Sequence, residues 1–83
     1  MSTEPRPATD VERELVELAL RIVTDIARMD ALTSEHPTAR VGCSRNTLKT
    51  AENLYIQAEQ AATWSRDPDL IEKVAKVRPP EAW

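Results

Sequence analysis

Apolar residues recur at steps of three and four over the first third of the chain. An α-helix turns once in about 3.6 residues, so this spacing gathers them on one side of a helix. The main set is Val11, Leu15, Leu18, Ala19, Ile22, Ile26 and Met29, and a second set widens it: Val16, Leu20, Val23 and Ala27. Thr9 and Glu12 stand at the spacing of a capping box, in which each side chain accepts a hydrogen bond from the other residue's backbone N–H. The pattern predicts a long amphipathic helix over residues 10–32.

A turn and two further helices follow. Residues 33–43 contain a proline and the single glycine, and both residue types interrupt helices. Ser44 is a suitable N-cap for a second helix that reaches residue 65 and has many alanines on its apolar side. Asp67 followed by proline is a specific helix start, and it predicts a short third helix that ends near residue 77.

These elements predict an all-α fold in which two long amphipathic helices form an antiparallel hairpin and a short third helix joins them. Residues 1–8 are expected to be a disordered N-terminal tail, and residues 9–77 a single three-helix domain. Residues 78–83 are expected to be a C-terminal Pro-Pro tail that ends in Trp83.

Composition restricts the chemistry that this chain can perform. The 83 residues are 41% hydrophobic and 30% charged with a net charge of −3, which is typical of a soluble folded domain. One cysteine cannot form an internal disulfide, one histidine and one cysteine do not supply the usual ligands of a zinc site, and one glycine does not make a phosphate-binding loop. We therefore expect no cofactor and no metal.

Catalysis is not expected either, and neither is a small-molecule substrate. His36 and Cys43 are the only candidates for a base and a nucleophile, but the glycine-rich oxyanion donors that usually accompany such a pair are missing. The lone cysteine fits a reducing compartment, no apolar run is long enough to cross a membrane, and the first residues lack the core of a signal peptide. The expected location is cytoplasmic, with no membrane partner.

The first helix is apolar over a wider arc than two small helices can cover. This excess predicts a protein partner, a second copy of the chain in a homodimer, or both. The widening residues Val16, Leu20 and Val23 are the candidate contact residues. Trp83 is a further candidate anchor, because tryptophan is enriched at interface hot spots. The alternative is that Trp83 folds back on the protein's own helices.

Residues 36–50 carry only positive charges, on Arg40, Arg45 and Lys49. Within this segment Val41 to Leu48 resembles the turn and the start of the recognition helix of helix-turn-helix DNA-binding proteins. The resemblance implies that the glycine forms the tight turn, and that three apolar residues pack inward: Val41, Leu48 and Ala51. It further implies that exposed side chains reach bases or phosphates: Arg40, Arg45, Asn46 and Lys49.

The sequence departs from the helix-turn-helix pattern at two positions. Thr38 stands where the family prefers a small alanine, and Pro37 shortens the helix that precedes the turn. The sequence therefore favours a small non-catalytic helical protein that works as a protein–protein interaction or regulatory accessory protein. The alternative is a small dimeric helix-turn-helix-like DNA-binding transcriptional regulator.

Overall fold

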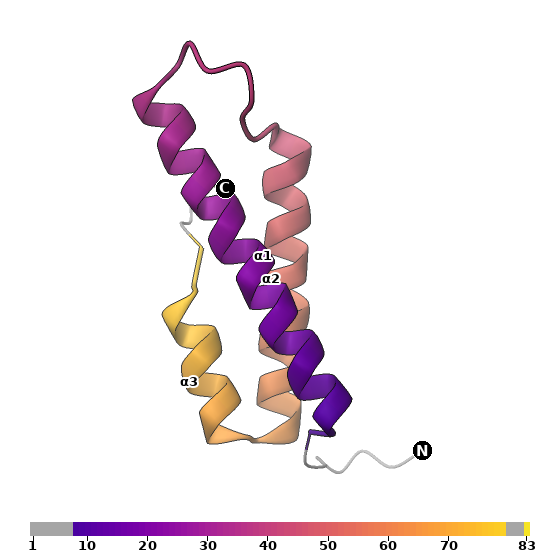
Figure 1. Cartoon of the computed structure of the whole chain (residues 1–83). Helices are drawn as coiled ribbons and strands as arrows, with labels where there is room; N and C mark the ends of the chain where they lie inside the picture. The colour runs from indigo at the N-terminus through magenta and orange to yellow at the C-terminus, as the bar shows by residue number, and fades with distance from the viewer. Residues whose placement is uncertain (1–7, 80–82) are drawn as a thin grey trace.

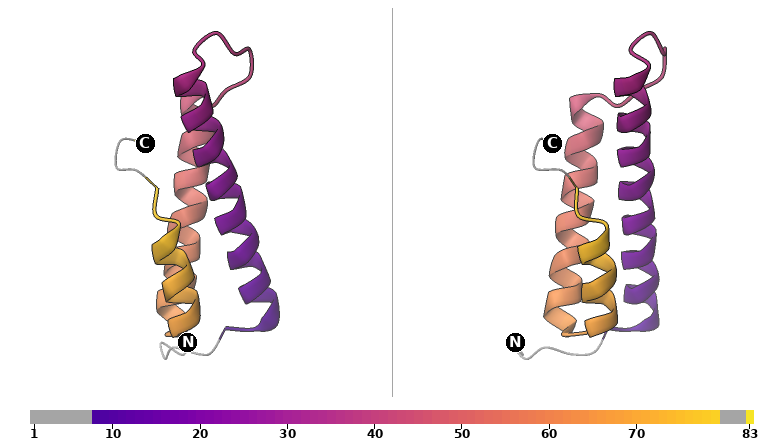
Figure 2. Two further views of the ribbon diagram at one scale, coloured as in Figure 1. Left: turned by 60° about the vertical axis from the view of Figure 1, so that its left-hand side comes forward. Right: turned by 90° about the vertical axis from the view of Figure 1, so that its left-hand side faces the viewer.

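The computed structural model describes residues 8–79 and 83. It contains three helices: α1 (Asp10–Glu35), α2 (Arg45–Ser65) and α3 (Pro68–Lys76). α1 and α2 run antiparallel along each other, and α3 turns back at the far end of the hairpin from the long loop (Figures 1 and 2). The predicted all-α hairpin with a short third helix is confirmed.

The three helix starts form as the sequence predicts. The backbone N–H of Glu12 donates to the Thr9 hydroxyl at 3.1 Å, and the Thr9 N–H donates to the Glu12 carboxylate at 3.3 Å, which completes the capping box. Ser44 accepts from the N–H of Thr47 at 3.2 Å. Asp67 accepts from two N–H groups of the first turn of α3, with Pro68 at the first helical position. These side chains supply partners for N–H groups that a helix start leaves unpaired.

α1 continues to Glu35 rather than ending at residue 32. The hydroxyls of Thr33 and Ser34 donate to the carbonyls of Met29 and Asp30 inside the helix, so these residues do not act as helix breakers. The helix ends directly before Pro37, because a proline disfavours helical backbone at the residue before it.

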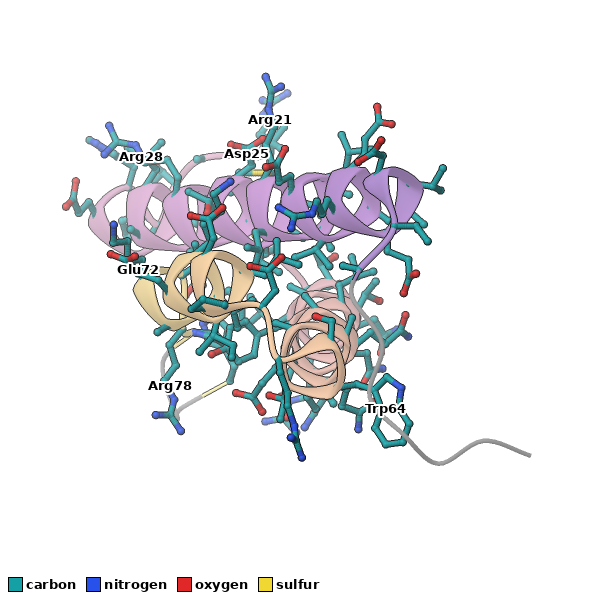
Figure 3. All side chains as sticks on the ribbon, turned by 90° about the horizontal axis from the view of Figure 1, so that it is seen from below. Arg21, Asp25, Arg28, Trp64, Glu72 and Arg78 are labelled. Atoms are coloured by element: carbon teal, nitrogen blue, oxygen red, sulfur yellow. The ribbon has the colours of Figure 1, made fainter. Side chains whose placement is uncertain are left out.

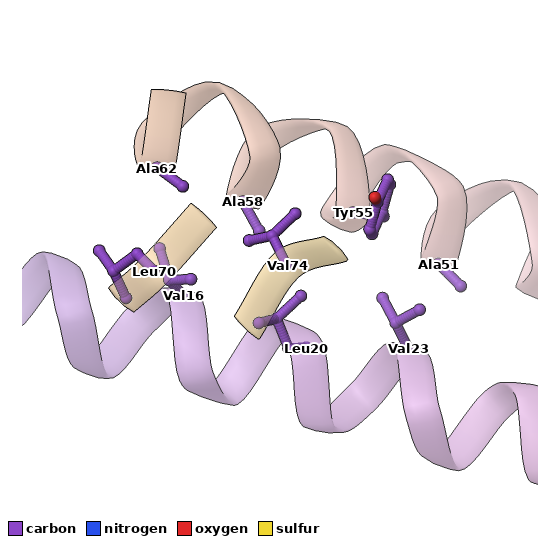
Figure 4. Packing of buried hydrophobic residues seen from close by; sticks show 9 residues of the cluster. All are labelled: Val16, Leu20, Val23, Ala51, Tyr55, Ala58, Ala62, Leu70 and Val74. Carbon is purple, nitrogen blue, oxygen red and sulfur yellow. The ribbon is translucent and has the colours of Figure 1, made fainter. Parts of the chain in front are cut away.

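The core is a thin seam that all three helices build. Its buried side chains are Val16, Leu20 and Val23 of α1, Ala51, Tyr55, Ala58 and Ala62 of α2, and Leu70 and Val74 of α3 (Figure 4). Alanines on α2 let the backbones of α1 and α2 approach closely, although each alanine buries little apolar area. The larger buried side chains are therefore those of Val16, Leu20 and Val23 on α1, Tyr55 on α2, and Leu70 and Val74 on α3.

The sequence assigned most of the two apolar sets of α1 the wrong way round, although Ala19 and Ile26 of the predicted inner set do pack against the core. Val16, Leu20 and Val23, predicted as partner contacts, are 4%, 6% and 1% exposed and form the core. Leu15 and Leu18, predicted as the inner seam, are 59% and 49% exposed. The apolar arc of α1 is wide enough that periodicity alone does not fix which part faces inward.

Two ion pairs join one side of α1 to α3 and to the residue that caps it. The Arg13 guanidinium pairs with the Asp67 carboxylate, which also caps α3. The Lys73 ammonium lies 2.8 Å from the Glu17 carboxylate. The hydrogen bond and positive charge of Lys73 lower the pKa of Glu17, and the hydrogen bond to Glu17 with the charges of Asp69 and Glu17 raises the pKa of Lys73. Arg13 and Glu17 thus face α3. The core residues Val16, Leu20 and Val23 lie on the neighbouring side of α1.

The Glu17–Lys73 pair predicts a stability that depends on pH. A carboxyl group whose pKa is lowered by folding stabilises the fold above its ordinary pKa of 4.5, and this contribution disappears as the pH falls through the folded pKa. We expect Glu17→Gln to be slightly less stable than wild type at neutral pH and to lose less stability on acidification, measured by urea unfolding across that range. Glu35→Gln, which removes an exposed carboxylate at the end of α1 that makes no ion pair in the described part of the chain, is the control and should follow wild type. Identical acid dependence for the Glu17 variant and wild type would contradict this account.

Candidate functional site

The largest exposed apolar feature lies along α1. We call it the α1 stripe, and its members are between 39% and 65% exposed: Val11, Leu15, Leu18, Ile22, Met29 and Leu32. They follow one another at alternating steps of four and three residues, with Asp25 at the one intervening position of this series. Side chains three and four residues apart on a helix are neighbours, so the stripe is one nearly continuous band. Sequence reasoning placed most of these residues in the core, and only the packed structure exposes them.

The α1 stripe borders a shallow apolar groove between α1 and α2. The groove has a volume of about 270 Å³, and its apolar lining is Leu15, Val16, Ala19, Leu54, Ala58 and Ala61. Polar groups are confined to Glu12 and Gln57. The stripe and the groove together make a surface on which a further helix can pack.

Charged side chains follow one flank of the α1 stripe. Glu14 lies toward the start of α1, and Arg21, Asp25 and Arg28 follow at helical spacing. The last three project away from α2 and α3 (Figure 3). In residues 8–79 and 83, none of these four side chains forms an ion pair. The flank therefore offers charges of both signs to a molecule that covers the stripe.

Trp83 folds back on the protein instead of projecting as an anchor. Its indole is half-buried and packs against the edge of the core, and it borders a hollow of about 400 Å³ with Arg45, Leu48 and Lys49 of α2. The indole N–H is buried without a hydrogen-bond partner, an arrangement that costs about 1–3 kcal/mol. The more exposed aromatic residue is Trp64, at 52%, near the end of α2 (Figure 3).

The basic segment is exposed, with Arg40 in the loop before α2 and the other three polar candidates in the first two turns of α2. Arg40, Arg45, Asn46 and Lys49 are all exposed. α2 has no acidic residue in its first turn, and the ammonium of Lys49 is 3.8 Å from a carboxylate oxygen of Glu52. The positive charges are therefore largely available to solvent.

The connection before α2 differs from what the helix-turn-helix resemblance implies. Val41, expected to pack inward, is 73% exposed, whereas Leu48 is half-buried and Ala51 is buried. Residues 36–44 link two antiparallel helices, and the N–H of Ala39 donates to the carbonyl of His36 in a single turn. A helix-turn-helix joins its two helices through a shorter turn of about three or four residues.

Gly42 serves a close approach rather than a tight turn, because its φ is not positive. A Cβ atom at this position would lie 2.8 Å from Cγ2 of Thr33 on α1. Thr33 is β-branched and donates its hydroxyl to the carbonyl of Met29, so it does not move aside easily. The loop thus packs on the last turn of α1 at Gly42.

Cys43 has the environment of a structural thiol. Its sulfur lies 3.6 Å from the carbonyl oxygen of Ile26, to which the S–H donates. Burial and the nearby negative charge of Asp30 raise the pKa of the thiol, which lowers its thiolate fraction, whereas a nucleophilic cysteine needs a lowered pKa. His36 is exposed at the end of α1. Among the described residues no group of three or more His, Cys, Asp or Glu side chains is placed to hold a metal ion.

No family model, curated protein or solved structure matches this chain. Within the described ranges, none of the helices has the length and apolar character required to cross a membrane.

The contact at Gly42 predicts a coupled pair of substitutions. Gly42→Ala should lower the free energy of unfolding by about 1 kcal/mol, because the new methyl group meets Thr33. In the Thr33→Ala background the same change should cost little or stabilise slightly, since the space is then open and alanine restricts the unfolded chain. A double-mutant cycle by urea unfolding measures the coupling, and an equal cost in both backgrounds would contradict the assigned contact.

Proposed function

We propose that this protein is a non-catalytic helical interaction protein that binds a protein partner through the α1 stripe. The observation that carries the proposal is the row of six large apolar side chains exposed along one side of α1. Contiguous exposed apolar bands of this kind mark interaction sites in soluble proteins. The unpaired charges on the flank would form the polar rim of the interface.

The shape and apolar character of the α1 stripe favour a helical partner. Each large apolar side chain that moves from water into an interface contributes favourably, at about 25 cal/mol per Å² of apolar area buried. A straight band of side chains at helical spacing, next to a shallow groove, fits the apolar face of another helix better than it fits an extended peptide or a small ligand. A regulatory or accessory role in the cytoplasm is the proposed setting.

The proposal predicts contact-dependent cross-linking at the stripe. A photoreactive amino acid at Leu18 should capture a protein when the purified chain is returned to its native lysate. The same group at Ala31, which is exposed on another side of α1, should not. Adding Ile22→Glu should lower capture at position 18 at least about tenfold, because a charge placed in an apolar interface costs 1.4 kcal/mol or more.

The outcome that contradicts the proposal is equal capture at positions 18 and 31, or capture at position 18 that Ile22→Glu leaves unchanged. Circular dichroism of each variant serves as the folding control. Both substituted positions of the stripe are exposed in the isolated chain, so the helical signal should be retained.

DNA binding is the second candidate function, with a dimer presenting two copies of the basic segment to two half-sites. The observation that favours it is the exposure of Arg40, Arg45, Asn46 and Lys49 near the start of α2, in a segment with no acidic residue before Glu52. Arginine and asparagine are the side chains that most often read guanine and adenine in the major groove.

The DNA hypothesis predicts that the protein shifts duplex DNA at low salt, and that Arg45→Ala and Lys49→Ala each weaken the shift and its salt dependence. Lys76→Ala, at an exposed lysine of α3, is the matched control and should bind as wild type does. A protein that shifts no DNA even at low salt would exclude this function.

A further inference from the structure

We propose that a second copy of this chain covers the α1 stripe, with the two α1 helices antiparallel across a two-fold axis near Arg21. The inference rests on the proposed function, because it names the partner of the same surface. It starts from the register of the stripe. Steps of four and three residues are the a and d positions of a heptad, the pattern that allows one helix to pack along another.

The apolar positions complement themselves when the helices run in opposite directions. With the axis near Arg21, Leu18 of one copy faces Ile22 of the other, and Val11 faces Met29. Each of these contacts occurs twice, as a two-fold interface requires. Asp25 of one copy then lies beside Leu15 of the other, toward the edge of the seam where its carboxylate can remain in water.

Charge selects the antiparallel direction. Along the flank, the acidic Glu14 lies two turns before Arg21, toward the start of α1. Arg28 lies two turns after Arg21, toward the end of α1. In the antiparallel arrangement each Glu14 lies opposite Arg28 of the second copy, which makes two ion pairs between side chains that have no ion-pair partner in the described part of one chain. The two Arg21 side chains approach each other at the axis, and Asp25 of each copy lies one turn away to offset this repulsion.

A parallel arrangement lacks these contacts. In register, the two Asp25 carboxylates would lie next to each other across the seam, where two like charges repel, whereas the antiparallel arrangement separates them. The opposite flank of the stripe carries Ala19 and Ile26, so Arg21 and Arg28 would meet no acidic residue across the seam. Ala19 instead suits the antiparallel dimer. It lines the groove between α1 and α2, and its small side chain near the two-fold axis lets the two copies approach each other closely there.

The test uses single cysteines in a Cys43→Ser background, with disulfide formation under mild oxidation as the readout. Arg21→Cys should form a disulfide-linked dimer, because the two copies of this residue lie near the axis. Glu14→Cys and Arg28→Cys should each form little dimer alone and should form a mixed disulfide when the two variants are combined. Thr24→Cys, exposed on another side of α1, is the control and should remain monomeric.

Sedimentation of wild type should give about twice the 9.3 kDa chain mass, and Leu18→Glu should raise the dimer dissociation constant at least about tenfold.

Each contrary result has a distinct meaning. Efficient disulfides in the separate Glu14→Cys and Arg28→Cys samples, with no preference for the mixture, would show that positions 14 and 28 do not face each other as the antiparallel dimer requires, and would overturn the inference. A monomeric wild type without disulfides overturns it as well. If the photoreactive group at Leu18 then still captures a different protein in a manner sensitive to Ile22→Glu, the proposed interaction function stands with another partner. If that capture also fails, the proposed function fails too.

Discussion

The structure depends on the close approach of α1 and α2 along a seam of small side chains. Ala51, Ala58 and Ala62 bring the backbone of α2 near α1, and α1 contributes one line of larger residues to the seam, Val16, Leu20 and Val23. Because the seam is narrow, it buries one part of the apolar arc of α1 and leaves the rest in water. The exposed stripe is thus a direct consequence of how thin the core is.

α3 completes this arrangement from one side. Leu70 and Val74 pack against the seam and complete the core. Asp67 both caps α3 and forms an ion pair with Arg13 of α1. Exposed ion pairs add little stability individually. They lie where the polar side of α1 meets α3, while the packing of Val16, Leu20 and Val23 in the seam keeps the α1 stripe turned outward. A surface held in one position by the fold is better suited to binding than a mobile one, because less freedom is lost on association.

The far end of the hairpin is organised by different contacts. The loop of residues 36–44 packs on α1 where Gly42 meets Thr33, and Trp83 returns to the side of α2. The basic residues Arg45 and Lys49 at the start of α2 border the hollow next to Trp83 and are exposed to solvent. The molecule therefore has an apolar surface along α1 and a separate basic one near the loop, and these two surfaces support the two candidate functions.

The sequence by itself determined the helices and their starts. Thr9 with Glu12, Ser44, and Asp67 with Pro68 act within one turn of the chain, so local chemistry is enough to place them. It also indicated that α1 is apolar over too wide an arc for one small core. Only the tertiary structure decided which part of that arc is buried, because the choice between Val16 and Leu15 depends on the alanines of α2 and the ion pairs to α3, which lie far away in the sequence. The same holds for Trp83 and Val41: each can face inward or outward by its own chemistry, and the space left by the other helices settles the outcome.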